Sequence, residues 1–440
     1  MTYQVQLDPA RLDAAQAPRE REISATQWKS FAGAFGGWML DGFDLSIFGL
    51  VLLPAMTELL PRSGYEVNTA TIGFFGQLQV ATFLAGWGCS FIWGPIADRL
   101  GRVPALTFSI LVYAVFTCLA GFSQDIWQLS AFRFLSAVGL GGEWAMAGTL
   151  VAETMPERLR PRFGGILHAG CYFGILCGSI INYAVGISLG WRVMFYIGIL
   201  PALFVLYIRS QTVEPARWVD VSEKTKRTSF SEFLKKILRP PLRARTWINV
   251  LLLFVALMGF WAGSQYLGAS ILTLSAQQGI AKPTALQLAT LGLGVLSLFT
   301  IIGCLAVPWF ADRYGRRNTL VATFILMIIG IAGGFGWAYY QNSMPLFFLF
   351  IPILGLGGAD FAMFTIWLPE QFPTEVRATA FAFCTTMSRF AAALGTFLIG
   401  YAIASAHTIG WPLALTAVPF LLGIWLAYLA PETRGQVLPE

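Results

Sequence analysis

Two carboxylates, Asp41 and Asp44, lie inside an apolar run that covers residues 31–56. An acid at the centre of a membrane helix costs about 2.5–3.5 kcal/mol on insertion scales, so two acids there indicate a function. Residues three apart share a helix face, and desolvation and mutual repulsion both disfavour two negative charges at that distance. We therefore expect at least one of these acids to take up a proton near neutral pH. The alternative is that one acid pairs with a buried arginine.

The composition is that of a membrane protein. The 440 residues are 56% hydrophobic and only 12% charged, which is too apolar for a soluble protein of this length. The net charge of +6 comes from basic residues in short loops, so it predicts membrane orientation and not a nucleic-acid partner. All six cysteines fall inside apolar runs, so we expect neither disulfides nor a metal site, and no cleavable signal peptide is evident.

Twelve apolar runs, each about eighteen residues or longer, predict twelve membrane helices and an all-α fold of two six-helix bundles. Most of the 29 basic residues fall in alternate loops and the termini, which places both termini on the cytoplasmic side. The expected segments are a tail over residues 1–30, bundles over 31–208 and 246–429, a cytoplasmic linker over 209–245, and a tail over 430–440.

The linker carries apolar residues at helical spacing, among them Phe230, Phe233 and Ile237. This spacing predicts an amphipathic helix that lies against the inner membrane surface. The alternative is a plain connection between the two bundles.

The two halves of the chain repeat each other. Residues 94–102 read Gly-Pro-Ile-Ala-Asp-Arg-Leu-Gly-Arg, and residues 308–316 read Pro-Trp-Phe-Ala-Asp-Arg-Tyr-Gly-Arg. Residues 40–44, Leu-Asp-Gly-Phe-Asp, align with residues 257–261, Leu-Met-Gly-Phe-Trp, in which both acids are replaced. The scaffold is therefore duplicated, whereas the proton chemistry is concentrated in the first half.

This pattern resembles the major facilitator superfamily over essentially the whole chain. Within that family, Asp-Gly-Phe-Asp at residues 41–44 resembles the aromatic-acid:proton symporters. Gly-Leu-Gly-Gly-Glu-Trp at 139–144 and Leu-Pro-Glu-Gln-Phe-Pro-Thr-Glu-Val-Arg at 368–377 are similar to the sialate and monocarboxylate:proton symporters. The resemblance implies a monomeric secondary transporter of the inner membrane, without a cofactor, that moves an organic acid with protons.

The loop motif suggests how one side of the membrane is closed. A carboxylate at Asp98 can accept hydrogen bonds from the amides at the start of the eleventh run, where the helix dipole is positive. Arg102 can pair with Glu153, and by resemblance such contacts form a gate. The alternative is that these loops are basic only because basic residues set the orientation of the protein in the membrane. The second half offers the same set in Asp312, which would face the start of the fifth run, and in Arg316 and Glu370.

Six ionisable side chains lie deep in the apolar runs. Counting 1.5 Å per residue places most of them near the bilayer midplane. Left unpaired in lipid they would cost about 15–20 kcal/mol together, so they must face one polar cavity between the halves. They are Asp41, Asp44, Glu143, Asp360, Arg389 and, nearer the outer side, Arg133.

Arg389 is the best candidate for a ligand of an anionic substrate. Its guanidinium stays charged and offers a planar fork that matches a carboxylate. The alternative is a permanent salt bridge to Asp360 or Glu143.

Polar and aromatic side chains are expected to complete the substrate cavity. Arg389 aligns with Tyr172 in the repeat, so these two should face each other, with Thr385 opposite His168. His168 is either a proton relay or an ordinary bundle residue. Trp144 either stacks on an aromatic substrate or packs between helices. Gln265 is a further hydrogen-bond candidate.

The sequence thus predicts proton-coupled uptake of a small organic carboxylate, with Asp41, Asp44 and Glu143 as proton carriers. A facilitative sugar carrier and a proton-coupled drug antiporter are the alternatives. An enzyme is not expected, because no nucleophile triad or metal cluster is visible.

Overall fold

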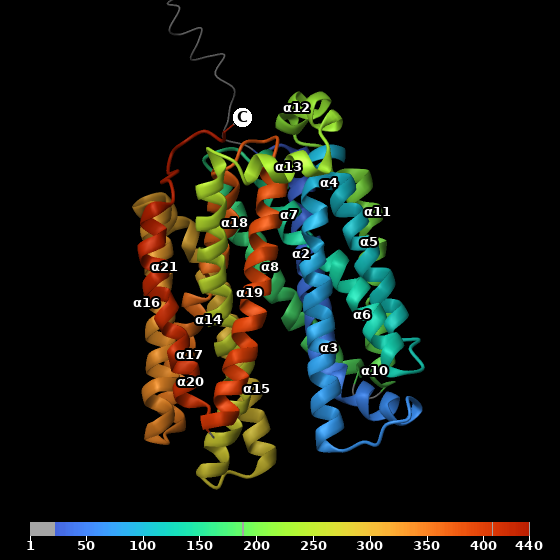
Figure 1. The fold of residues 1–440 in the computed structure, drawn as a ribbon, viewed down its shortest axis with the longest axis vertical. Helices are drawn as coiled ribbons and strands as arrows, with labels where there is room; N and C mark the ends of the chain where they lie inside the picture. The colour runs from blue at the N-terminus through green and yellow to red at the C-terminus, as the bar shows by residue number, and fades with distance from the viewer. Residues whose placement is uncertain (1–22, 187–188, 407, 440) are drawn as a thin grey trace, which may run out of the picture.

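The computed structural model describes residues 23–186, 189–406 and 408–439, and these residues form helices joined by short turns, without a strand (Figure 1). The expected all-α membrane fold in two halves is confirmed. The helices of the first half are α2 (Ala25–Arg62), α3 (Thr69–Cys89), η1 (Ser90–Ile92), α4 (Trp93–Leu100), α5 (Arg102–Ala120), α6 (Ile126–Leu140), α7 (Glu143–Thr154), α8 (Arg160–Ile181), η2 (Asn182–Gly186), α10 (Trp191–Ile197) and α11 (Leu200–Gln211).

The second half repeats this arrangement beside the first, and two linker helices, α12 (Ala216–Arg227) and α13 (Phe230–Ile237), lie across one end (Figure 1). The helices of the second half are α14 (Leu242–Gln277), α15 (Lys282–Tyr314), α16 (Arg316–Ile331), η3 (Ala332–Trp337), η4 (Ala338–Gln341), α17 (Met344–Gly357), α18 (Asp360–Glu370), α19 (Arg377–Ala406), α20 (Gly410–Ala414), η5 (Leu415–Ala417) and α21 (Val418–Leu429).

The membrane-spanning segments differ in detail from the twelve expected runs. Among the described residues, ten helical segments are long and apolar enough to cross a membrane. The pair Ala25–Ile47 and Val51–Arg62 makes an eleventh if its 51° bend lies within one span. The expected sixth run is divided between α10 and α11, each of which is shorter than a span.

The first helix begins earlier than expected, at Ala25, because Ser24 caps it. The Ser24 hydroxyl accepts from the Gln27 amide at 3.2 Å, and the Gln27 side chain accepts from the Ser24 amide at 2.9 Å. This reciprocal capping box satisfies two amides at the helix start that lack intrahelical partners.

The linker forms two helices in place of the single one expected. Ser229 and Glu232 form a capping box at the start of α13. Phe233 and Ile237, on its apolar face, are fully buried, and α13 contacts α4, α14 and α19. The expectation that this face lies on the membrane surface is therefore wrong for these two residues, because neighbouring helices cover them first.

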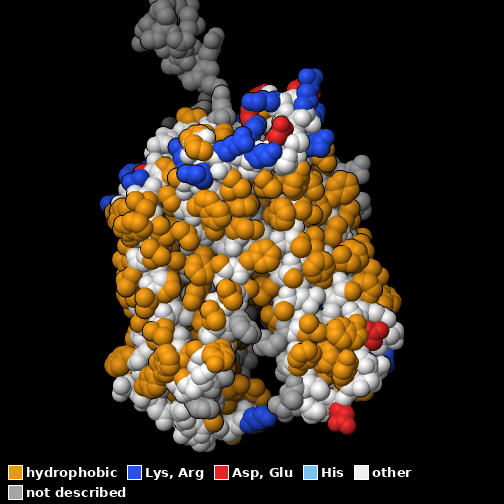
Figure 2. All heavy atoms as spheres, viewed as in Figure 1, with side chains coloured by type: hydrophobic (Ala, Val, Ile, Leu, Met, Phe, Trp, Pro, Cys, Tyr) orange, Lys and Arg blue, Asp and Glu red, His pale blue; other side chains and the backbone are white. Residues whose placement is uncertain are grey.

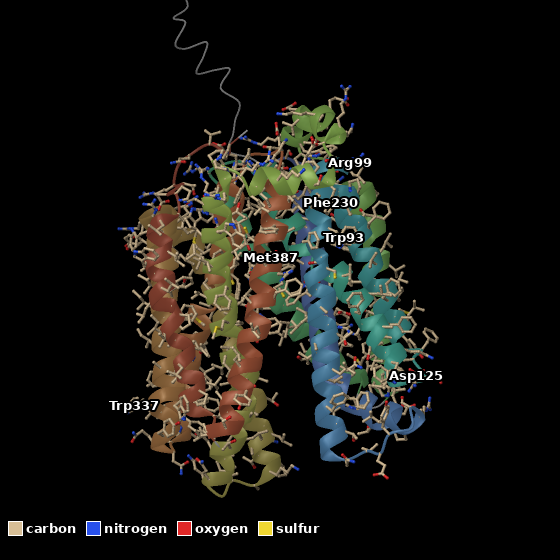
Figure 3. All side chains as sticks on the ribbon, in the orientation of Figure 1. Trp93, Arg99, Asp125, Phe230, Trp337 and Met387 are labelled. Carbon is tan, nitrogen blue, oxygen red and sulfur yellow. The ribbon has the colours of Figure 1, made fainter. Side chains whose placement is uncertain are left out.

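The two ends of the molecule differ in charge. Basic side chains gather over α12, α13 and the adjoining turns (Figure 2), and we call this end the basic face. Arg99 and Phe230 lie near it, whereas Asp125 and Trp337 lie toward the opposite end (Figure 3). Figure 2 also shows a hollow between the two halves near the end opposite the basic face.

Candidate functional site

Asp44 is held by a cation and a hydroxyl inside the first half. Its carboxylate accepts from the Thr117 hydroxyl of α5 at 2.6 Å and pairs with an Nη of Arg133, on α6, at 3.3 Å. Thr117 in turn lies 2.8 Å from the hydroxyl of Ser136. The alternative in which one acid of the pair binds a buried arginine therefore describes Asp44.

Asp41 and Glu143 form the second pair of acids, across α2 and α7. Both side chains are fully buried, and none of their four carboxylate oxygens has a hydrogen-bond partner among the described residues. Asp41 is close enough to Glu143 and Arg389 for direct electrostatic interaction. A Cβ on Gly37 would lie 2.1 Å from Glu143 Oε1, so the missing side chain at this position makes room for the carboxylate. Asp41 thus has two acids, Glu143 and Asp44, and one cation, Arg389, as charged neighbours.

Arg389 lies on α19 at the junction of the two halves. Its guanidinium carbon is 4.0 Å from the ring centroid of Trp87 and 5.9 Å from that of Trp144, and an Nη donates to the carbonyl of Gly141 at 2.9 Å. Its Nε has no hydrogen-bond partner, and it makes no salt bridge with the described acids. Among the described residues, Arg389 therefore forms no salt bridge with Asp360 or Glu143, which was the alternative. Cation–π contacts hold the guanidinium instead.

His168 and Trp144 share one hydroxyl, which belongs to a residue that the sequence did not single out. The indole Nε1 of Trp144 donates to Thr365 Oγ1 at 2.8 Å, and Nδ1 of His168 lies 3.2 Å from the same oxygen. The Trp144 and His168 ring centroids are 5.4 Å apart. Thr385 was expected opposite His168; its hydroxyl donates to carbonyls of its own helix, and its position relative to His168 stays a prediction.

Tyr172 and Asp360 lie together in the second cross-half contact. The Tyr172 ring makes edge contacts with His168 at 6.1 Å and Phe260 at 6.4 Å, and we find no contact with Arg389 among the described residues. Asp360 is the first residue of α18; it is fully buried and interacts electrostatically with Tyr172 and Cys304. Tyr172 was expected to face Arg389, but in the structure it lies beside Asp360.

The remaining polar candidate, Gln265, lies on α14, but its side chain is outside the described residues. No group of His, Cys, Asp and Glu within the described chain is arranged to hold a metal ion.

The loop motif of the first half binds the second half directly. Asp98 accepts from the amides of Ala378 at 3.3 Å and Thr379 at 2.8 Å, at the start of α19, which is the contact expected of it. Arg102 bonds both carboxylate oxygens of Glu153 at 2.9 Å. Glu153 also pairs across the halves with an Nη of Arg377 at 2.6 Å. We call Asp98, Arg102, Glu153 and Arg377 the first ion cluster.

The second motif forms its internal pair but does not reach across. Arg316 bonds both oxygens of Glu370 at 2.9 and 3.0 Å, as expected. Asp312, however, pairs with Arg316 at 3.3 Å and stays 42% exposed, without a hydrogen bond to α8 in the described part of the chain. Its expected contact with the start of the fifth run is therefore wrong. We call Asp312, Arg316 and Glu370 the second ion cluster.

Two glutamates that the sequence analysis missed cap the helices after these motifs. Glu214 follows α11 and accepts from the amides of Arg102 at 3.0 Å and Val103 at 2.9 Å. Glu432 follows α21 and accepts from the first two amides of α16 at 3.0 and 3.2 Å. Burial raises the pKa of Glu214, although these amides oppose the shift. In the sequence, these two residues could have been recognised because each is a glutamate beside a proline shortly after the last helix of its half.

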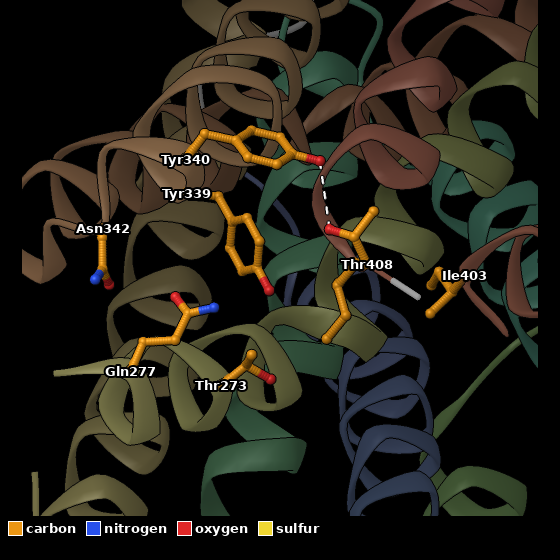
Figure 4. A pocket seen from close by; sticks show the side chains of 8 residues that line it. Thr273, Gln277, Tyr339, Tyr340, Asn342, Ile403 and Thr408 are labelled. Atoms are coloured by element: carbon orange, nitrogen blue, oxygen red, sulfur yellow. Dashed lines mark hydrogen bonds between the residues drawn. The ribbon is translucent and has the colours of Figure 1, made fainter. Parts of the chain in front are cut away.

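A separate pocket of about 640 Å³ lies at the end of the second half opposite the basic face (Figure 4). Tyr340 and Thr408 join across it through hydroxyls 3.4 Å apart. Tyr339 and Gln277 also line it, and none of the buried acids does. This pocket is therefore distinct from the charged centre.

A helical bundle of two halves with buried charged side chains at its centre is the architecture of a multi-pass membrane transporter. A family model described as Major Facilitator Superfamily matches residues 34–351 and 263–439, and the chain belongs to this superfamily.

Two relatives and one solved structure show what this chain is similar to. It is 29% identical to a probable 4-methylmuconolactone transporter of Cupriavidus pinatubonensis, over 94% of this chain and 92% of the relative. It is 27% identical to a cis,cis-muconate transport protein of Acinetobacter baylyi, over 94% and 96%. The proton:xylose symporter XylE, bound to 6-bromo-6-deoxy-D-glucose, superposes with a TM-score of 0.77 at 17% identity, covering 95% of this chain and 98% of XylE, which shows the shared fold.

Proposed function

We propose that this transporter takes up a small organic carboxylate together with a proton, by exposing a central site alternately on the two sides of the membrane. The observation that supports this most is Arg389. It is a buried cation without an anionic partner in the described residues, next to two buried acids without hydrogen-bond partners, Asp41 and Glu143.

The anion is assigned to Arg389 because of its geometry. Its Nε is unused, and one Nη is fixed on Gly141, so a planar edge of the guanidinium is left for a carboxylate. Charge-assisted hydrogen bonds of this kind are the strong ones. The relatives named for muconate and 4-methylmuconolactone carry planar, unsaturated acids or their lactones, and the rings of Trp87 and Trp144 beside Arg389 suit the same chemistry.

The proton is assigned to Asp41 and Glu143. Two buried carboxylates without hydrogen-bond donors would cost several kcal/mol each if ionised, so the pair holds at least one proton. Asp44, by contrast, has Arg133 and Thr117 as partners inside the first half. We therefore give Asp44 a positioning role within that half, and Asp41 is the exchanging acid.

The orientation follows from charge. Basic residues on the loops of one side mark the cytoplasmic side, so the basic face and both termini are placed in the cytoplasm and the protein in the inner membrane. The first ion cluster closes that face in this structure, and the hollow of Figure 2 opens toward the other side. The transporter works as a monomer, since the site lies between two halves of one chain.

The test is uptake into proteoliposomes with cis,cis-muconate as the first probe, followed by aromatic acids, aliphatic mono- and dicarboxylates and sialic acid. An acid exterior should drive accumulation in the wild type. Asp41→Asn should abolish accumulation while the protein stays folded, whereas Asp220→Asn, which changes an exposed acid on α12, should not. Accumulation that persists in Asp41→Asn would contradict the assignment.

A second variant tests the anion site. Arg389→Ala should weaken acid binding by about 1.5–3 kcal/mol, which is roughly one to two decades in Kd, and Arg389→Lys by part of that. The methyl ester of the same acid should bind equally to wild type and mutant. Unchanged acid affinity in Arg389→Ala would place the anion elsewhere. Uptake of a neutral sugar without pH dependence would instead favour a facilitative carrier, and proton-driven efflux of lipophilic cations an antiporter.

A further inference from the structure

Asp360 is a buried acid of the second half with no compensating charge. Its side chain is fully buried, and its carboxylate oxygens have no hydrogen-bond partner among the described residues beyond a weak approach of the Phe361 amide in its own helix. Other buried acids have cations: Asp44 has Arg133, and Glu370 has Arg316. Asp360 therefore belongs with Asp41 and Glu143, the acids that the proposed function uses, although it lies in the other half.

The neighbours of Asp360 supply no positive charge. The titratable groups that interact with it are the phenol of Tyr172, on α8, and the thiol of Cys304, on α15, both neutral. The arginines on the packed helices α16 and α19 are engaged elsewhere, Arg316 by Glu370 and Arg389 by Gly141 and Trp87. The start of α18 favours a negative charge only weakly, which does not offset the desolvation of an unpaired carboxylate.

The internal repeat shows why this acid differs from its counterpart. Glu143 aligns with Asp360, and each begins the helix that follows a glycine-rich break. Arg389 aligns with Tyr172. Across the interface, Asp41 of the first half interacts with Arg389 of the second half, whereas Asp360 of the second half interacts with Tyr172 of the first. The residue at the repeat position of Arg389 is therefore a phenol, which supplies no positive charge to Asp360.

We propose that Asp360 is a second proton-binding site, independent of the Asp41–Glu143 pair. Its role in coupling rests on the proposed function: a monoanion carried with one proton moves no net charge, whereas a monoanion carried with two protons moves one positive charge inward. The class of ligand is a proton, and a sodium ion is the competing chemistry that the experiment must separate.

Infrared difference spectroscopy on the purified full chain tests the site without transport. A protonated carboxyl group has a C=O stretch that a carboxylate lacks, and the wild type should show such a band at neutral pH. Asp360→Asn should lose part of it, and Asp41→Asn a separate part. Asp220→Asn, which removes an exposed carboxylate, should change nothing. If Asp360→Asn does not fold, Asp360→Glu should shift the band instead.

Each outcome decides the proposal. A band unaltered by substitution at Asp360 would overturn it, and so would loss of the wild-type band on adding sodium at constant pH. Current across planar bilayers then measures coupling, with a transported monocarboxylate as the probe because cis,cis-muconate is a dianion at neutral pH: Asp360→Asn should lower the charge moved per monoanion from one to zero. Failure of all proton-driven uptake would contradict the proposed function, while the infrared band would still report whether Asp360 holds a proton.

Discussion

The two ion clusters at the basic face come from the same repeated motif but hold different contacts. In the first, Asp98 binds the start of α19 and Glu153 binds Arg377, so both acids reach into the other half. In the second, Asp312 is 42% exposed, and Glu370 binds Arg316 and the hydroxyl of Thr433, all within its own half. In the described residues, the hydrogen bonds and ion pairs that these two motifs make between the halves therefore come from the first cluster.

The repeat partner of Arg377 explains the difference. Arg160, at the start of α8, donates to the carbonyl of Ala152 at 2.9 Å and lies 3.6 Å from Glu157. It interacts electrostatically with Glu370 across the halves, but the two are too far apart for a salt bridge in the described chain. Both clusters lie at the same face, so alternating access requires their cross-half contacts to break when this face opens. In the second cluster this contact is long-range, whereas in the first it is a direct ion pair.

The largest effect is expected for Glu153→Gln. This change leaves Arg377 buried without an anion and weakens the bonds to Arg102, and breaking a buried pair in this way costs about 3–5 kcal/mol. The unfolding temperature of the detergent-purified protein should fall clearly. Glu370→Gln is the matched control and should lower it less, because Arg316 keeps Asp312. Equal decreases in unfolding temperature in the two variants would contradict the difference between the two ion clusters.

The next effect concerns opening of the basic face. Asp98→Asn replaces a charged acceptor of two amides, which is worth about 1.5–3 kcal/mol. Because the change affects the closed face and not the central site, transport rate should fall much more than substrate affinity. Asp312→Asn should leave both nearly unaltered. A changed Kd with a normal rate in Asp98→Asn would show that the cluster is not a gate.

A smaller effect is expected at the end of the chain. Thr433→Val removes a hydroxyl that donates to Glu370 at 2.5 Å, while Arg316 continues to bind both carboxylate oxygens. We expect a loss of about 1 kcal/mol in stability. Thr433→Ser keeps the hydroxyl and should keep the wild-type melting temperature, and a valine variant as stable as the wild type would show that the hydroxyl contributes nothing.

The smallest effect is expected for Glu375→Gln. Burial raises the pKa of this acid, but the ammonium groups of Lys224 and Lys236 outweigh it and hold that pKa below its usual range. A lowered pKa means that the stabilisation exists at neutral pH and is lost as the pH falls through the lowered folded-state pKa. These pairs are largely exposed, so about 0–1 kcal/mol is expected at pH 7. Melting temperatures of variant and wild type should therefore converge in acid; a difference that persists would need another cause.

The parts of the site that the sequence predicted are those fixed by local spacing and by the repeat. Arg102 with Glu153 and Arg316 with Glu370 could be paired because both halves offer the same residues at the same positions. The exposed position of Asp312 could not be predicted, because the two copies of the motif have different neighbours in the folded protein. A repeat gives the partners that exist within a half and does not give the conformational state.

The charged centre was predictable in its acids but not in their partners. Depth along each run identified Asp41, Asp44 and Glu143, whereas the choice of Arg133 as the partner of Asp44 depends on how α2 and α6 are rotated. Thr365 carried no signal, because a threonine in an apolar helix is common and gains meaning only when an indole and an imidazole both meet its hydroxyl. The rotation of packed helices depends on the whole bundle, so no single apolar segment of the sequence predicts it.

The absence of a side chain at Gly37 sets a rule for how related chains can diverge. Any substitution there competes with the Glu143 carboxylate for the same space, since a Cβ would lie 2.1 Å from Oε1. The two positions should therefore change together in evolution: alanine at 37 should be accompanied by the shorter aspartate at 143. A laboratory selection for transport that starts from Gly37→Ala should recover Glu143→Asp among its first suppressors.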